Sequence, residues 1–228
     1  LHQLIHSFPT RRSSDLNYSA INNFAVREAR GEYLLFLNND VEIITENWLE
    51  EMLQLCQQKD VGMVGAKLYY PDDTIQHAGV VVGLGGVAAH VLCKLPRNAE
   101  GYMGRLRCVQ EISAVTAACM MVKTSVFKAV GGFDEELKVA FNDIDLCMKV
   151  RKYGVKIVFT PYAELYHYES KSRGMEDTPE KQLRFSREVN CFRRKWEREL
   201  LKGDPYYNPN LTLNNTDCSL RKQEKNGD

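Results

Sequence analysis

Two short apolar runs limit the kind of fold that this chain can adopt. The run YLLFL at residues 33–37 shows no alternation of apolar and polar positions. This pattern is typical of a strand covered by helices on both faces, most often a parallel strand of an α/β sheet. The run VGMVGAKLY at residues 61–69 reads as a second buried strand. The first run stops on Asn38, Asn39 and Asp40, which form either a turn or a set of ligands.

Helical and extended patterns alternate along the rest of the chain. Apolar residues at helical spacing predict helices over 18–30, 45–56, 123–130, 143–153 and 178–200. Further strands are predicted at 111–122 and 155–159, with Thr45 capping the second helix and Pro161 ending the last strand. In the last helix, the residues expected to dock on the core are Leu183, Val189, Phe192 and Trp196. We therefore expect an α/β fold with a doubly wound mixed sheet, helices on both faces and ligands at the carboxyl ends of strands.

Composition excludes several classes of function. With 228 residues, 44% hydrophobic and 26% charged, the chain suits one globular domain. Its 30 basic and 30 acidic residues cancel, so neither nucleic acid nor an anionic membrane is the expected main partner. The 7 cysteines include no CxxC pair, which favours reduced thiols and a cytoplasmic setting. The longest apolar stretch, residues 78–92, is too short and too rich in glycine for a membrane span, so no transmembrane segment is expected.

The two ends of the chain differ from its middle. Residues 1–16 show no helical or alternating period, and they lack the apolar region of a signal peptide. Residues 6–16, HSFPTRRSSDL, resemble the in-frame translation of a sequencing adapter, so we interpret 1–16 as non-native. We expect one domain over 17–213, followed by a polar tail at 214–228 without periodicity, which we predict to be disordered.

Asp40 is the first candidate for chemistry. A carboxylate at the mouth of a buried strand can hold a divalent cation together with substrate phosphate oxygens. Asn38 and Asn39 beside it can supply neutral oxygens or orient ribose hydroxyls. The alternative is that the three residues only form an Asx turn and cap the next helix.

Two more candidates lie further along the chain. Asp143 and Asp145 fall in the first turn of a predicted helix, where helix capping alone can explain them, but where a general base facing a substrate can also be fixed. His167 follows the last strand and can return to the same place, either as a metal ligand or as a satisfied polar side chain. His77 and His90 have no such support, and GLGG at 83–86 is interpreted as a turn.

Five segments together resemble one known family. In chain order they are NNFAVREARGEYLLFLNNDVEI, DDTIQHAGVVV, VTAACMMVKTSVFKAVGGFDEEL, NDIDLCMKVRKYG and AELYHYES, and they cover most of residues 17–172. They are similar to glycosyltransferase family two, whose catalytic domain has the GT-A fold. The resemblance implies transfer of a sugar from a nucleotide-diphosphate donor to an acceptor hydroxyl, with inversion at the anomeric carbon.

The resemblance also implies roles for single residues. Asp40 matches the last position of a DxD-like motif and, with His167, would hold Mn²⁺ or Mg²⁺, while Asn38 and Asn39 would lie on the donor side. Asp143 matches the catalytic base. The residues implied on the acceptor side are Asp134, Glu135 and Asp145. The implied partners are a nucleotide-sugar donor and a glycan or lipid-linked glycan acceptor of surface polysaccharide biosynthesis, handled in the cytoplasm or peripherally at the inner face of the membrane.

The chain departs from the family pattern in three respects. Asn142 stands where a glutamate is common, which removes a negative charge beside Asp143, and Ala117 stands where similar enzymes carry glycine. Nothing before Asn17 resembles the N-terminal βα units that bind the nucleotide base, so we expect the chain by itself to bind nucleotide sugar weakly or to misfold. Two alternatives stay open: a non-catalytic or fragmentary family member that only binds glycan or a partner, and a sugar nucleotidyltransferase.

Overall fold

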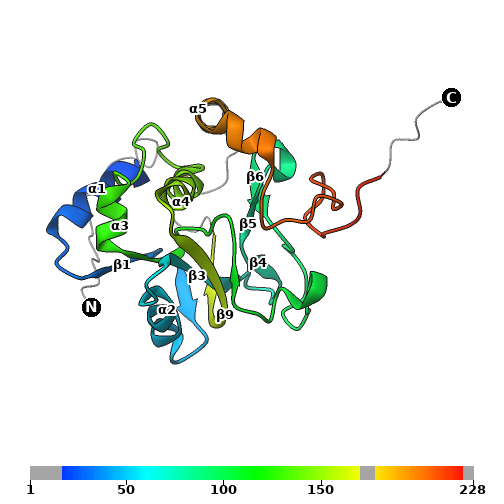
Figure 1. Ribbon diagram of the computed structural model, residues 1–228, viewed down its shortest axis with the longest axis horizontal. Coiled ribbons are helices and arrows are strands. Elements are labelled where there is room, and N and C mark those ends of the chain that lie inside the picture. Colours follow the sequence, from blue (N-terminus) through cyan, green and yellow to red (C-terminus); the bar gives the residue numbers. More distant parts are fainter. Residues whose placement is uncertain (1–16, 170–177, 223–228) are drawn as a thin grey trace.

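The structure, a computed structural model, describes residues 17–169 and 178–222 and contains a mixed sheet with helices on both faces (Figure 1). Within this part of the chain, seven strands run in the order β1-β8-β3-β9-β2, with β4 paired to β3 and β7 to β9, while β5 and β6 form a separate hairpin. The strands are β1 (Tyr33–Leu37), β2 (Val41–Ile43), β3 (Val61–Tyr69), β4 (Ile75–His77), β5 (Val80–Val82), β6 (Ala88–His90), β7 (Gln110–Glu111), β8 (Cys119–Lys123) and β9 (Lys156–His167). The α-helices are α1 (Tyr18–Glu28), α2 (Trp48–Cys56), α3 (Thr124–Ala129), α4 (Asn142–Tyr153) and α5 (Pro179–Lys202).

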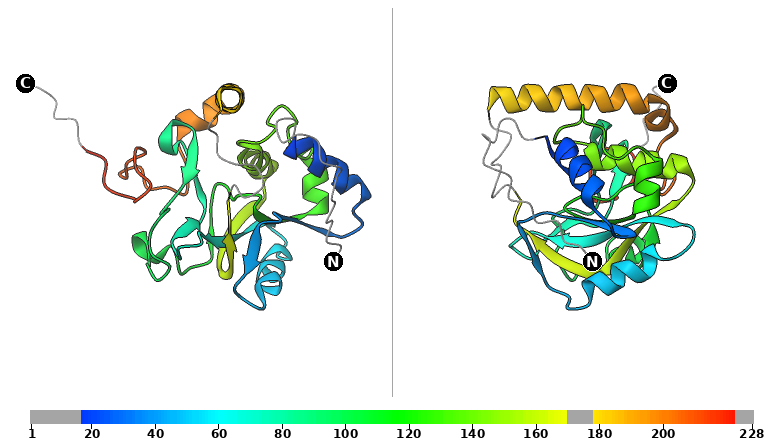
Figure 2. Two further views of the ribbon diagram at one scale, coloured as in Figure 1. Left: turned by 180° about the vertical axis from the view of Figure 1, so that it is seen from behind. Right: turned by 90° about the vertical axis from the view of Figure 1, so that its left-hand side faces the viewer.

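The helices divide between the two faces of the sheet. In Figures 1 and 2, α2 covers one face, and α1, α3 and α4 cover the other, with α5 outside them. Trp48, Met52 and Cys56 recur every four residues, so they form the buried stripe of α2 against the sheet. The predicted arrangement of helices on both faces is confirmed.

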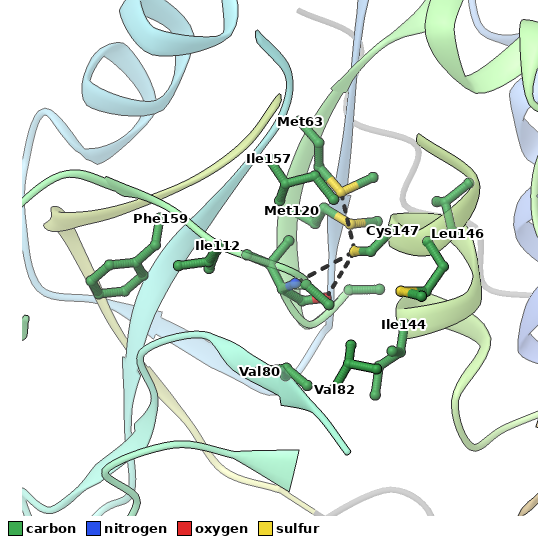
Figure 3. Packing of buried hydrophobic residues seen from close by; sticks show 14 of the residues in the cluster. Met63, Val80, Val82, Ile112, Met120, Ile144, Leu146, Cys147, Ile157 and Phe159 are labelled. Atoms are coloured by element: carbon green, nitrogen blue, oxygen red, sulfur yellow. Dashed lines mark hydrogen bonds between the residues drawn. The ribbon is translucent and has the colours of Figure 1, made fainter. Parts of the chain in front are cut away.

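The face opposite α2 is packed around α4. Figure 3 shows Cys147 of α4 pointing at Met63 of β3, with a distance of 3.4 Å between the two sulfur atoms. The same thiol accepts a hydrogen bond from the backbone N–H of Val115, and burial raises the pKa of Cys147. This thiol therefore behaves as a small apolar side chain that fixes α4 on the sheet.

The central strand matches its prediction, whereas the direction of β1 does not. All nine residues of β3 are buried, and β3 runs parallel to β9 but antiparallel to β8 and β4. Residues 33–37 were expected to be a parallel strand, but β1 pairs with β8 in antiparallel fashion, with Tyr33 opposite Lys123. An apolar run without alternation indicates only that helices cover both faces of the strand. That covering does not depend on whether the neighbouring strand is parallel or antiparallel.

The strand predicted at 111–122 is broken. Only 110–111 and 119–123 form strands, because the backbone amides of residues 115–117 donate to side chains instead of to a neighbouring strand. Val115 N–H donates to Cys147 Sγ (3.4 Å), Thr116 N–H to His77 Nε2 (3.5 Å) and Ala117 N–H to Asp143 Oδ2 (3.2 Å). Three consecutive amides are thus turned toward α4 and β4.

Two predicted boundaries are wrong. Pro161 does not end its strand, because β9 continues to His167 across a register shift opposite residues 65–67 of β3, where a residue without N–H is tolerated. Thr45 does not cap α2, which begins after Asn47. The Thr45 hydroxyl instead accepts a hydrogen bond from the backbone N–H of Glu164 and so ties the start of α2 to β9.

The C-terminal part also differs from expectation. Thr178 caps α5 as predicted, and Phe192 and Trp196 are buried, but Leu183 is 53% exposed. The tail was expected to be disordered from residue 214, yet over 214–222 it is placed against the body of the chain and buries Cys218. Residues 1–16 and 223–228 lie outside the described residues. No helix in the described part is long and apolar enough to cross a bilayer.

Candidate functional site

The ends of β1 and β9 bring two of the predicted residues together. After β1, the chain turns at residues 38–40 and enters β2, in which Val41 pairs with His167 at the end of β9. Asp40 directly precedes Val41, and its carbonyl accepts a hydrogen bond from the backbone N–H of Tyr168 (2.8 Å). Strand pairing therefore joins residues that are more than 120 positions apart in sequence.

Asp40 and His167 form a close, largely buried pair. Asp40 Oδ1 lies 3.3 Å from His167 Nε2, and the two side chains are 13% and 11% exposed. The amide Nδ2 of Asn38 lies 3.1 Å from the same imidazole nitrogen, whereas Asn39 is exposed at the turn. Two of the three polar residues after β1 thus face His167.

Gln76 determines the tautomer of His167. The Oε1 atom of Gln76 lies 2.7 Å from His167 Nδ1, and its Nε2 donates to the His167 carbonyl (3.2 Å). An amide oxygen only accepts, so Nδ1 carries the imidazole proton and Nε2 keeps a lone pair, which accepts from Asn38 Nδ2 and lies beside Asp40 Oδ1. Burial lowers the pKa of His167, and Asp40 and Glu169 oppose this effect only in part. The imidazole is therefore neutral near pH 7.

This pair fits a divalent cation. A carboxylate and a neutral imidazole nitrogen, with the other imidazole nitrogen held by a second residue, form a usual arrangement for metal ligands. Within the residues that the structure describes, no group of three or more His, Cys, Asp and Glu side chains is arranged to hold a metal. Asp40 and His167 would therefore supply a partial ligand set that leaves positions for water or substrate oxygens.

Asp143 stands at the start of α4 with a fixed carboxylate. Its Oδ2 accepts from Ala117 N–H (3.2 Å) and its Oδ1 from Ile144 N–H (2.9 Å). Residue 141 adopts a left-handed conformation (φ 62°), which turns the chain sharply into the helix. Asn142 is buried and donates to the Val139 carbonyl (3.1 Å), so it holds the preceding loop.

The segment before β8 connects Asp143 with the end of β1. Ala117 N–H donates to Asp143, and the carbonyl of the next residue, Ala118, accepts from the backbone N–H of Asn38 (3.0 Å). Tyr18 of α1 donates to the Ala117 carbonyl (3.3 Å), and burial together with Asp143 raises the pKa of its phenol. From the sequence, Tyr18 could be assigned only to an apolar helical stripe.

The two histidines to which the sequence assigned no role meet beside this site. His77, at the end of β4, and His90, at the end of β6, have their Nδ1 atoms 2.9 Å apart, with the rings nearly perpendicular (81°). Burial lowers the pKa of both, that of His77 strongly. Each ends a strand of three residues, which is too short to carry a periodic pattern.

The residues expected on the acceptor side lie apart from the Asp40–His167 pair. Asp145 is fully buried and accepts from Trp196 Nε1 (2.8 Å) and from Lys195 Nζ (2.8 Å). Asp134 also binds Lys195 (2.5 Å), and Glu135 accepts from the side chain of Asn23 (3.0 Å). Asp143 and Asp145 thus serve different neighbours, and Asp145 holds α5 on α4.

A large surface hollow lies elsewhere. It has a volume of about 1100 Å³, and Lys67, Arg97 and Glu164 are among the residues that line it. None of the predicted site residues lines it. The candidate site is therefore defined by its hydrogen-bonded side chains and not by this hollow.

Comparison with known proteins gives consistent matches. Residues 8–188 match the profile of a family described as "Glycosyltransferase like family". The chain is 56% identical over 211 residues to the uncharacterized protein y4gI of Sinorhizobium fredii, covering 92% of this chain and 23% of that protein. It is 42% identical over 213 residues to the O-antigen biosynthesis protein RfbC of Myxococcus xanthus, covering 93% of this chain and 16% of that protein. The chain therefore spans less than a quarter of the length of these two relatives.

The fold also has a counterpart among solved structures. Superposition on the crystal structure of GalNAc-T7 with UDP, GalNAc and Mn²⁺ gives a TM-score of 0.59 at 14% identity, over 85% of this chain and 36% of that one. A likeness at this level of identity establishes the fold alone.

Proposed function

Since this chain belongs to the glycosyltransferase-like family and has a GT-A type fold, we propose that it transfers a sugar from a nucleotide-diphosphate donor to a glycan hydroxyl, with inversion. One observation carries the proposal. Ala117 and Ala118 are consecutive, and their backbone holds the carboxylate of Asp143 and the backbone of Asn38, so the proposed base and the proposed donor side share one support.

Asp40 and His167 are the proposed ligands of Mn²⁺ or Mg²⁺. His167 offers the lone pair of its Nε2 and Asp40 a carboxylate oxygen, 3.3 Å apart. When bound, such a cation neutralises charge on the leaving diphosphate. The Mn²⁺ and UDP named with GalNAc-T7 support this assignment by analogy of fold.

Asp143 is the proposed general base. Its two oxygens are oriented by the backbone amides of Ala117 and Ile144, so the carboxylate keeps one direction without depending on a flexible partner. In the reaction, Asp143 accepts the proton of the acceptor hydroxyl. The hydroxyl oxygen then bonds to the anomeric carbon, from the face opposite the diphosphate, and the bond between that carbon and the diphosphate oxygen breaks.

The other predicted residues take supporting parts in this proposal. Asn38 and Asn39 orient the donor, and Asp134 and Glu135 lie on the acceptor side. Asp145 supports that side by holding α5 and not by touching the acceptor, because its carboxylate is enclosed by Lys195 and its other partners. The name of the RfbC relative supports a role in surface polysaccharide synthesis, with donor and acceptor met in the cytoplasm or at the inner face of the membrane.

The test is a transfer assay with the chain. Purified, folded chain with MnCl₂ is incubated with UDP-, GDP- and dTDP-sugars at millimolar concentration, because weak donor binding is expected, and with methyl glycosides as acceptors. The nucleotide products are separated by chromatography. We expect release of nucleoside diphosphate, and Asp143→Asn should reduce it by about 10²–10⁴-fold, the usual contribution of a general base. Asp217→Asn, in an exposed turn, is the matched control and should leave the rate unchanged.

Each alternative predicts a different product. Pyrophosphate from a sugar phosphate and a nucleoside triphosphate would identify a nucleotidyltransferase. Absence of metal-dependent release from every donor would favour a non-catalytic member that binds glycan or a partner. Equal rates for the wild type and Asp143→Asn would remove Asp143 from the role of base.

A further inference from the structure

The strand β4 fixes the tautomers of two histidines beside the proposed site. Its second residue, Gln76, places the proton of His167 on Nδ1. Its third residue, His77, contacts His90 through the Nδ1 atoms of both rings, 2.9 Å apart. Hydrogen-bond chemistry then determines which nitrogen of each ring carries a proton.

The derivation starts at a backbone amide that can only donate. Thr116 N–H points at His77 Nε2 (3.5 Å), so this nitrogen must offer a lone pair. A neutral His77 therefore carries its proton on Nδ1 and donates it to Nδ1 of His90. His90 must accept on Nδ1, which leaves its own proton on Nε2. A second proton on either ring would place two N–H groups face to face.

His167 and His90 are therefore both neutral, but they present opposite hydrogen-bonding groups. His167 offers a lone pair on Nε2, and His90 offers an N–H on Nε2. Burial lowers the pKa of His90, against the opposing charges of Asp143 and Glu169. Among the described residues, none forms a hydrogen bond with His90 Nε2.

On these observations, and resting on the proposed function, we propose that His90 Nε2–H binds the acceptor sugar. It donates to the oxygen of the hydroxyl next to the one that attacks, so that the sugar ring is oriented over Asp143. His77, the partner of His90, accepts from the backbone N–H of Thr116, and the next backbone N–H, that of Ala117, donates to Asp143. His90 is thus linked to the proposed base, which favours the acceptor over the diphosphate as the ligand. The site then selects an acceptor with two neighbouring hydroxyls, a sugar ring, over one with an isolated hydroxyl.

The first test reads the tautomers directly and needs no turnover. In the chain labelled with ¹⁵N-histidine, long-range proton–nitrogen correlations distinguish protonated from bare ring nitrogens, with assignment by single His→Gln variants. We expect the proton on Nδ1 in His77 and on Nε2 in His90. A bare Nε2 in His90 would overturn the proposal, whether or not the chain transfers sugar.

The second test uses variants at position 90. His90→Phe keeps the ring shape and removes the donor, whereas His90→Gln returns an N–H near the position of Nε2. With the methyl glycoside that the wild type uses best, His90→Phe should raise the acceptor KM about tenfold, as expected for one lost hydrogen bond, and His90→Gln should recover much of this. Hydrolysis of the donor by water, without acceptor, is measured beside transfer, and in both variants it should fall less than transfer does.

The third test identifies the acceptor oxygen. With the wild type, a deoxy acceptor that lacks the neighbouring hydroxyl should show the same rise in KM as the parent acceptor shows with His90→Phe. Combining the deoxy acceptor with His90→Phe should raise KM no further. Additive rises in KM would overturn the proposal, as would equal falls in the rates of hydrolysis and transfer. A wild type without any turnover would count against the proposed function, and the tautomers would still decide whether His90 is a donor.

Discussion

Replacing Asp145 by alanine should loosen α5 from α4, because this carboxylate joins the two helices from a fully buried position. It accepts from Trp196 Nε1 (2.8 Å) and forms ion pairs with Lys195 (2.8 Å) and Lys149 (3.3 Å). Although burial acts to lower it, the hydrogen bonds to Asp134 and Asp145 raise the pKa of Lys195, so this ammonium group stays charged.

The size of the effect follows from burial. Removing one partner of a buried ion pair costs about 3–5 kcal/mol, because the other charge stays buried without compensation. Here Lys195 is 33% exposed and keeps Asp134, and Lys149 is 18% exposed, so solvent and the remaining partner offset part of the loss. We expect Asp145→Ala to lower the free energy of unfolding by about 2–4 kcal/mol, and the melting temperature by roughly 5–15 °C for a chain of this size.

Urea unfolding followed by circular dichroism measures this change. The matched control is Asp60→Ala, which removes a similar ion pair with Lys156 (2.7 Å) at the surface and should leave the unfolding midpoint almost unchanged. Trp196→Phe in both backgrounds isolates the coupling between the indole and the carboxylate, expected at about 1.5–3 kcal/mol for a hydrogen bond to a charged group. If Asp145→Ala unfolds no earlier than Asp60→Ala, the carboxylate does not hold α5.

Three further changes test other contacts. Gly65→Ala should lower the midpoint of thermal unfolding, because its Cβ would lie 2.3 Å from Cγ1 and 2.5 Å from Cβ of Val115, and adding Val115→Ala should recover little of the loss, because that Cβ remains. Glu188→Gln should lower the free energy of unfolding by about 1–3 kcal/mol. The two carboxylate oxygens accept from two successive backbone amides before α4 (2.9 and 3.1 Å), whereas an amide side chain has only one acceptor oxygen. Faster hydrogen exchange of those two backbone amides measures the loss. Gln76→Met should weaken Mn²⁺ binding by about 10–100-fold, since it frees the tautomer of His167. Electron paramagnetic resonance of unbound Mn²⁺ measures this without turnover, and an unchanged affinity would show that the contact with Gln76 does not support metal binding.

The sequence predicts the residues whose signals are local. Asp40 follows an apolar run and Asp143 lies in a first helical turn, and both positions can be read within about five residues. His167 could be predicted only as a return to the same place, yet the pairing of β2 with β9 brings it to 3.3 Å from Asp40. The arrangement of helices on both faces of the sheet could likewise be predicted, from the apolar stripe of α2 and the apolar run of β3.

The histidine pair could not be predicted in this way. His77 and His90 end strands of three residues, and their contact depends on how the hairpin β5–β6 folds back on β4. The family resemblance implied Asp145 on the acceptor side, while the sequence pattern showed only that it shares a helical turn with Asp143. Two residues along a helix point about 200° apart, so the second carboxylate meets Trp196 of α5 while the first meets Ala117.

The broken strand at 112–118 explains why contacts that the sequence pattern does not predict lie at the candidate site. Its residues are small or β-branched, so the pattern favours a continuous strand, and a continuous strand would use its amides on a neighbouring strand. Instead, the amides of Val115, Thr116 and Ala117 donate to side chains that lie 26 to 39 residues away in sequence. Those side chains, on α4 and β4, include the proposed base and the histidine that fixes the tautomer of His90. A segment that departs from its own local preference must be held by tertiary contacts, and here those contacts are the ones that orient the proposed chemistry.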